Sequence, residues 1–140
     1  MTERLDREKM NSLIQLCDGF LSLHRSEGFG LVMAEAMNLG TATVATNWSA
    51  NTEFMTKETS CLVDAKQIPV GNAYQYEQEG LTWADADVHQ AAEYLKRLKD
   101  DPEYYREKAE KGKKYIEENL SLEKCADVIR KRMNEILHLE

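Results

Sequence analysis

Cysteine is scarce in this sequence of 140 residues, and long apolar runs are absent. The three cysteines, Cys17, Cys61 and Cys125, stand far apart and form no CxxC pair and no Cys/His cluster. That spacing argues against a zinc site and a disulfide framework and favours reduced thiols, so we expect a cytoplasmic protein. No apolar run approaches the roughly 20 residues of a membrane span. The polar start, Met1–Asp6, predicts no signal peptide.

Basic residues are also in the minority. The chain has 18 Lys and Arg against 25 Asp and Glu, a net charge of −7. This balance argues against a non-specific nucleic-acid binder, whose affinity would rest on neutralising phosphates with Lys and Arg. It leaves room for a single nucleotide, because a few backbone N–H groups hold a diphosphate even on an acidic protein. The length is sufficient for one domain with its own core.

Hydrophobic periodicity predicts an α/β fold with parallel strands. Apolar residues at helical spacing predict helices over 5–17 and 31–39. Short apolar or β-branched runs predict strands over 20–23, 41–46 and 61–63. Helices that alternate with strands in this way favour parallel strands in one sheet.

Beyond the predicted sheet the sequence changes character twice. Residues 66–84, interrupted by proline and glycines, are interpreted as an irregular loop or arm that carries Tyr74 and Tyr76. Residues 85–140 have the periodicity of helices. Their expected N-terminal caps are Asp85 or Asp87, Asp101 before Pro102, and Ser121.

Two glycines, Gly28 and Gly30, lie between the first predicted strand and the helix after it. A helix start offers unpaired N–H groups and a partial positive charge, which together bind phosphates. Glycines at this point allow a sharp turn and a close approach of the backbone to a ligand. In open α/β sheets such a ligand lies at the carboxyl ends of the strands. A G-x-G turn by itself is a weak signal.

Carboxylates flank the glycines on both sides: Glu27 comes just before them, and Glu35 lies one turn into the helix. Carboxylates accept hydrogen bonds from hydroxyls. A nucleotide sugar fits this arrangement, because its phosphates lie in the middle and its hydroxyls at both ends. The alternatives are structural: the helix dipole favours an early Glu by about 0.3–1 kcal/mol, and Glu27 has the character of a solvated loop residue. The spacing alone does not decide between them.

The segment from Phe20 to Thr46 resembles the core of glycosyltransferase family 4, whose members have the GT-B fold and an E-x7-E signature between a strand and a helix. The signature here is Glu27-Gly28-Phe29-Gly30-Leu31-Val32-Met33-Ala34-Glu35. The resemblance implies a Rossmann-like parallel sheet, part of a GT-B carboxy-terminal domain, followed by C-terminal helices. Residues 1–65 are then the nucleotide-sugar-binding core, 66–84 the irregular arm and 85–140 the helical part.

The same resemblance implies roles for single residues in a retaining enzyme. That enzyme transfers a hexose from a nucleoside-diphosphate sugar to a glycan or lipid-linked acceptor, as in polysaccharide biosynthesis, without a metal or other cofactor. Glu27 is then the catalytic residue that contacts hydroxyls of the transferred sugar, and Glu35 binds the ribose. The diphosphate is held by Gly28, Phe29, Gly30 and Leu31. Candidates for lining the pocket are His24, Asn51 and Glu53; a hydrogen-bonded structural role is the stronger alternative for His24.

The family also has an Arg and a Lys that bind the diphosphate upstream of the signature, and an amino-terminal acceptor domain. Only 26 residues precede Glu27 here. We therefore expect a carboxy-terminal fragment that is inert alone, reaches its acceptor through the missing domain and self-associates, with the full enzyme peripheral to a membrane. Two alternatives stay open: a stand-alone nucleotide-sugar-binding or pseudo-enzyme module, and a helical interaction domain.

Overall fold

A three-stranded parallel sheet forms the centre of the computed structural model, which describes residues 4–71 and 80–138. Its strands lie in the order β1 (Phe20–Ser22), β2 (Thr43–Thr46) and β3 (Cys61–Val63). Helix α2 (Leu31–Asn38) connects β1 to β2. The α/β fold with parallel strands that the periodicity predicted is therefore confirmed, and the arrangement is Rossmann-like.

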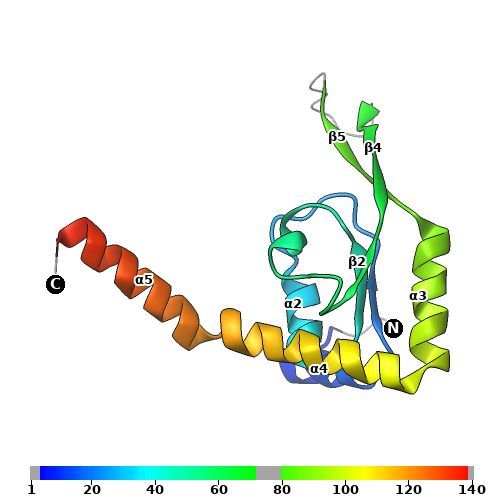
Figure 1. Ribbon diagram of the computed structural model, residues 1–140, viewed down its shortest axis with the longest axis horizontal. Coiled ribbons are helices and arrows are strands. Elements are labelled where there is room, and N and C mark those ends of the chain that lie inside the picture. Colours follow the sequence, from blue (N-terminus) through cyan, green and yellow to red (C-terminus); the bar gives the residue numbers. More distant parts are fainter. Residues whose placement is uncertain (1–3, 72–79, 139–140) are drawn as a thin grey trace.

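Each face of the sheet is covered by a helix (Figure 1). Helix α2 covers one face, and α3 (Val88–Asp100) covers the other. Successive side chains of a strand point to opposite faces, so the buried strand residues divide into two clusters. Ala45 and Leu62 pack with α2 and with the carboxy-terminal part of α4 (Pro102–Asn119). Val44, Cys61 and Val63 pack with α3.

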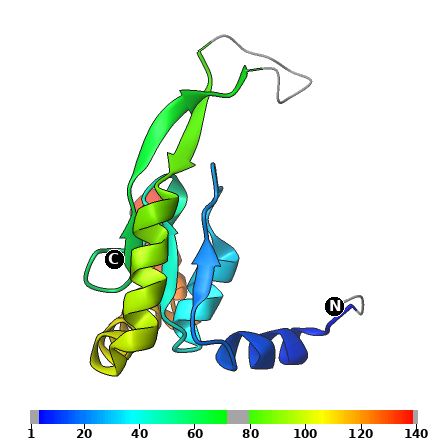
Figure 2. The same cartoon turned by 90° about the vertical axis from the view of Figure 1, so that its right-hand side faces the viewer.

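The remaining helices begin where the sequence provides caps. The Asp101 carboxylate accepts a hydrogen bond from the Tyr104 N–H at 2.9 Å and starts α4 (Pro102–Asn119). Ser121 starts α5 (Leu122–Leu137) in the same way. Asp87, rather than Asp85, caps α3. Figure 2 shows α1 (Arg7–Gln15) at the foot of the sheet.

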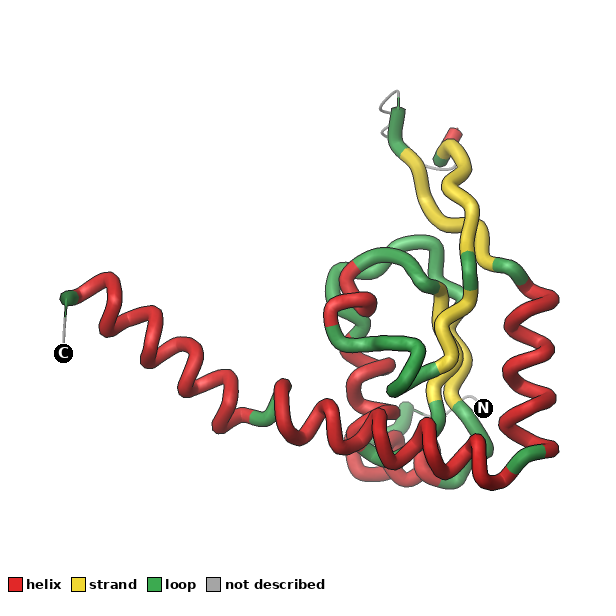
Figure 3. The backbone as a smooth tube through the Cα atoms, in the orientation of Figure 1, coloured by secondary structure: helices red, strands yellow, loops and turns green. Residues whose placement is uncertain are grey.

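The segment predicted as an irregular arm, 66–84, is regular at both of its ends. Strands β4 (Ala65–Pro69) and β5 (Thr82–Ala86) pair antiparallel and form a ribbon that extends past the carboxyl end of β3 (Figure 3). The prediction of irregular structure is wrong there, because the two strands pair with each other across residues 70–81. The sequence carries no tight-turn signature that would have revealed this pairing. Tyr74 and Tyr76, which we placed on this arm, lie outside the described residues.

Helix α5 leaves the body of the molecule after α4 (Figure 1). None of its described side chains is buried. Among residues 4–71 and 80–138, no helix combines the length and apolar character needed to cross a bilayer.

Candidate functional site

The turn between β1 and α2 ends at Gly30, the residue that precedes the helix. Its φ of 89° and ψ of 45° lie in the left-handed region, which favours glycine. A Cβ at this position would stand 2.5 Å from the Met33 Cε and 3.3 Å from the Asn51 Cβ. The backbone angles therefore favour glycine, and a side chain would also need Met33 and Asn51 to shift. The first N–H groups of α2, from Leu31 onward, have no helical carbonyl to bind, and they lie at the carboxyl end of β1.

Gly28 differs from Gly30. Its backbone is outside the left-handed region, and a Cβ there would meet nothing within 4 Å. The chain bends at Gly28 as well, but the backbone angles there do not require glycine. What Gly28 provides is open space in front of the helix, which suits the close approach of a ligand.

Glu27 lies on the loop before these glycines with its side chain exposed. Its backbone is held by one residue of another loop. The Glu27 N–H donates to the Ser49 Oγ at 2.9 Å, and the Ser49 hydroxyl donates to the Glu27 carbonyl at 2.6 Å. Ser49 itself has a φ of 80° and a ψ of −163°. The Glu27 loop follows β1 and the Ser49 loop follows β2, and these two strands are neighbours in the sheet.

Glu35 lies one turn into α2 and is half-buried. Its Oε1 accepts a hydrogen bond from the Arg7 guanidinium at 3.1 Å, an ion pair that joins α2 to α1. The Arg7 side chain is 82% exposed, so this pair is worth little stability, about 0–1 kcal/mol.

His24 and Asn51 form a hydrogen-bonded network under the turn. The His24 Nε2 lies 3.0 Å from both the Trp48 carbonyl and the Asn51 Oδ1. Both partners are acceptors, so Nε2 carries the proton. The buried Asn51 amide donates to the Thr46 carbonyl at 3.0 Å. These partners favour the structural role for His24 and Asn51, whereas Glu53 is exposed.

An open groove of about 730 Å³ runs along α2, from Leu31 at its start to Asn38 at its end. It brings together Phe29, Leu31 and Glu35 from the motif and Arg7 from α1. Glu27 is not among its lining residues. The opposite wall comes from the end of α4 and the start of α5, through Ile116, Glu117, Leu120, Ser121 and Leu122.

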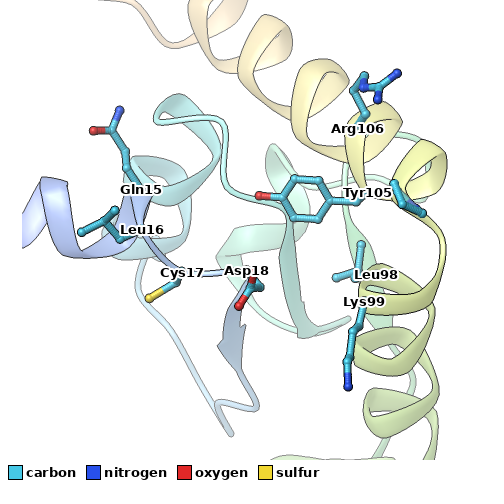
Figure 4. A pocket seen from close by; sticks show the side chains of 9 residues that line it. Gln15, Leu16, Cys17, Asp18, Leu98, Lys99, Tyr105 and Arg106 are labelled. Carbon is cyan, nitrogen blue, oxygen red and sulfur yellow. The ribbon is translucent and has the colours of Figure 1, made fainter.

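A second groove, of about 700 Å³, lies between the end of α1 and the turn from α3 to α4 (Figure 4). Its lining includes Cys17 and Asp18, which precede β1, and Leu98 and Tyr105. It is therefore at the amino end of the strand, whereas ligands of open α/β sheets bind at the carboxyl end. The groove beside Glu35 is the better candidate for a ligand site.

The clearest raised pKa values belong to groups away from the motif. Burial raises the pKa of the Cys61 thiol, and burial together with its contact to Cys61 raises the pKa of the Tyr104 phenol. Both groups lie in or against the cluster under α3. Within the described part of the chain, no three His, Cys, Asp or Glu side chains are grouped so as to hold a metal ion.

Sequence reasoning did not identify Ser49 or Arg7 as part of this site. Ser49 stands in the loop after the second strand, where its hydroxyl gives no signal until the two loops are placed side by side. Arg7 has the pattern of an ordinary surface residue on an amphipathic helix. Both contacts join segments that are remote in the chain, 22 residues apart for Ser49 and 28 for Arg7.

Comparison with known proteins agrees with this geometry. A family model described as glycosyl transferases group 1 matches residues 1–115, which include the whole parallel sheet, the motif and α3. Comparison with curated proteins gives no match. The family implies binding of a nucleotide-sugar donor and of an acceptor, and its reaction is the transfer of a glycosyl group. Because the match covers most of the chain, this protein belongs to the group 1 glycosyl transferases.

Proposed function

We propose that this chain binds the nucleoside-diphosphate sugar of a retaining hexosyltransferase of family 4, whose acceptor is a glycan or a lipid-linked sugar. The observation that carries the proposal is the turn at Gly30. It leaves the first N–H groups of α2 without helical partners, at the carboxyl end of a parallel strand, with one carboxylate on each side.

The diphosphate is assigned to the backbone between Gly28 and Leu31. A helix amino terminus carries a partial charge equivalent to roughly +0.5, and its N–H groups bind phosphate oxygens directly. The open space beside Gly28 admits the phosphates to this backbone. The same end of α2 stabilises the negative charge that develops on the diphosphate as it leaves. We therefore assign donor binding to the protein alone, without a metal.

The nucleoside is assigned to the groove beside Glu35. Ligand pockets commonly measure about 300–1,000 Å³, and this groove measures about 730 Å³. A carboxylate has about four lone-pair sites. The bond from Arg7 to the Glu35 Oε1 therefore leaves acceptor capacity for the ribose hydroxyls. The apolar side chains of Phe29, Leu31 and Leu120 offer a surface for the base.

Glu27 is assigned to the sugar. It lies before Gly30 in the chain and outside the nucleoside groove, so it and Glu35 contact opposite ends of the donor. Its carboxylate accepts hydrogen bonds from sugar hydroxyls and faces the positive charge that develops on the sugar ring as the diphosphate departs.

Calorimetry on the 140-residue chain tests these assignments separately. The probes are UDP, GDP and ADP, each with its own sugar conjugate: UDP-glucose, GDP-mannose and ADP-glucose. Hydrogen bonds to charged groups contribute about 1.5–3 kcal/mol, which is about 10- to 100-fold in Kd. Glu35→Gln should weaken the binding of the nucleoside diphosphate and of its sugar conjugate, both by that factor. Glu27→Gln should weaken only the sugar conjugate.

Glu110→Gln, an exposed carboxylate on α4, is the matched control and should change neither Kd. Binding in the presence of EDTA tests metal independence, and a loss of affinity contradicts it. Retention is tested with a full-length enzyme that includes the expected acceptor domain, by NMR of its transfer product, whose anomeric configuration should match that of the donor. If both Glu27→Gln and Glu35→Gln bind like the wild type, the site assignment is wrong.

A further inference from the structure

We infer that Ser49 is a positioning residue for Glu27: its hydroxyl fixes the Glu27 backbone and thereby the direction of the Glu27 carboxylate. The inference rests on the proposed function of Glu27. It adds a residue from a different loop, after a different strand, to the machinery that the motif itself provides.

The Ser49 hydroxyl makes two hydrogen bonds to one residue, Glu27. The Ser49 Oγ accepts from the Glu27 N–H at 2.9 Å and donates to the Glu27 carbonyl at 2.6 Å. These two groups belong to the peptide units on either side of the Glu27 Cα. Holding both units restricts the two backbone dihedrals of Glu27, and the dihedrals set where its side chain starts.

Glu27 lies where the loop has little packing to hold it. The residues before Glu27 are tied to the protein: the His24 ring is bonded to the Trp48 carbonyl, and the Arg25 carbonyl accepts from the Ala84 N–H at 2.9 Å. Glu27 and Gly28 are exposed, so packing does little to hold them. The hydrogen bonds from Ser49 therefore restrain the backbone at Glu27, the residue that carries the carboxylate.

The Ser49 backbone is itself strained. Its φ of 80° and ψ of −163° lie in a region that is essentially restricted to glycine. The other described non-glycine residue with positive φ is His138, at the end of α5. The strained conformation is held from the carboxyl side, because the Ser49 carbonyl accepts from the Thr52 hydroxyl at 2.7 Å and from the Thr52 N–H at 3.2 Å. A glycine would relieve the strain but would lack the hydroxyl.

This opposition between strain and hydroxyl yields a direct test with Ser49→Gly. Glycine adopts the observed backbone without strain, so the variant should be at least as resistant to urea as the wild type. Amide hydrogen exchange followed by NMR should show the Glu27 N–H exchanging at least about tenfold faster, while the amides of β2 keep their rates. An unchanged rate at Glu27 would overturn the inference. Ser49→Ala removes the hydroxyl but keeps the strain, so it should reproduce the faster exchange at lower stability.

The effect on function is measured with the same probe pairs, UDP-glucose against UDP and their GDP and ADP counterparts. Ser49→Gly should weaken the sugar conjugate about tenfold and leave the bare diphosphate unchanged, as Glu27→Gln does. A purely structural role would weaken both alike or neither. In the double variant with Glu27→Gln, the loss should not add, because both changes remove the same contact.

The outcomes separate the two claims. If the wild-type chain binds no probe, or binds UDP-glucose no differently from UDP, the proposed role of Glu27 fails. Whether the Ser49 hydroxyl holds the Glu27 backbone is still decided by the exchange rate of the Glu27 N–H. If the wild type distinguishes the sugar and Ser49→Gly does so equally, the positioning role of Ser49 is overturned and the proposed function stands.

Discussion

Helices α3 and α5 both carry an apolar stripe, yet α3 lies against the sheet and α5 extends away from the body (Figure 1). In α3 the stripe buries Ala91 and Leu98, which are 2% and 5% exposed. In α5 the exposed fraction of the large apolar side chains ranges from 52% at Met133 to 91% at Leu122. An apolar stripe therefore predicts a helix and the face that needs cover, but what covers that face depends on the rest of the fold.

The energetic consequence differs in the same way. Burying a side chain such as Leu98 stabilises the fold by about 1.5–3 kcal/mol, and α4 adds the buried Ile116 and Ala109 to the two core clusters. Helix α5 adds no buried residue. Substitutions at buried contacts of the body should therefore lower the free energy of unfolding much more than substitutions in α5.

The largest effect is expected at Gly112, where α4 packs closely against Thr59 and Met37. A Cβ there would lie 2.8 Å from the Thr59 carbonyl oxygen and 3.4 Å from the Met37 Cε. Gly112→Ala should lower the free energy of unfolding in urea by about 1–3 kcal/mol. This is opposite in sign to the gain of about 1 kcal/mol that alanine brings to an open helix position.

Glu110→Ala, at an exposed position of the same helix, is the matched control and should change stability by no more than about 0.5 kcal/mol. If Gly112→Ala is instead more stable than the wild type, α4 does not pack against the Thr59 loop at this distance, and the contrast with α5 loses its basis.

The parts of this fold that sequence could predict are those fixed by near neighbours. The caps at Asp101 and Ser121 were correctly placed because a cap is a contact over three residues. The β4–β5 ribbon was missed because its strands meet only across an intervening segment, as with Ala65 opposite Ala86.

The candidate site follows the same division. The preference for glycine at Gly30 is visible in the motif, since the turn is local. The bond between Ser49 and the Glu27 backbone and the ion pair of Arg7 with Glu35 depend on which strands are neighbours and on where α1 packs. The roles of Glu27 and Glu35 toward a donor stay predictions until binding is measured.

An intermediate effect is expected from alkaline pH. Burial holds the pKa of the Cys61 thiol above its ordinary value of 9.0 in the folded chain and also raises that of Tyr104. The unfolded chain therefore loses these protons at lower pH than the folded chain. The associated stability is fully present below the unfolded pKa, at about pH 9, and is lost as pH rises through the folded pKa.

Urea unfolding across this range should show a flat free energy from about pH 7 to 8.5, followed by a decline. One proton of difference corresponds to about 1.4 kcal/mol per pH unit. Cys61→Ala should make the decline shallower, although it lowers stability at every pH by leaving a small cavity. Cys17→Ala, at an exposed thiol, is the control and should leave the pH profile unchanged. A wild-type profile that stays flat above about pH 10 contradicts the burial of the thiol.

The smallest effect on stability is expected from removing α5. Ending the chain at Ser121 removes no buried residue among the described residues 122–138, so the free energy of unfolding of the body should change by less than about 0.5 kcal/mol. The exposed stripe should instead govern association, because apolar patches of this kind favour contact between copies. Sedimentation should show the wild type associating as its concentration rises, and Ile129→Gln, on the stripe, should weaken that association. Lys131→Gln, on the same helix but off the stripe, should not. If Ile129→Gln lowers the stability of the body as much as Gly112→Ala does, α5 is covered by its own body in solution, and the contrast between α3 and α5 fails.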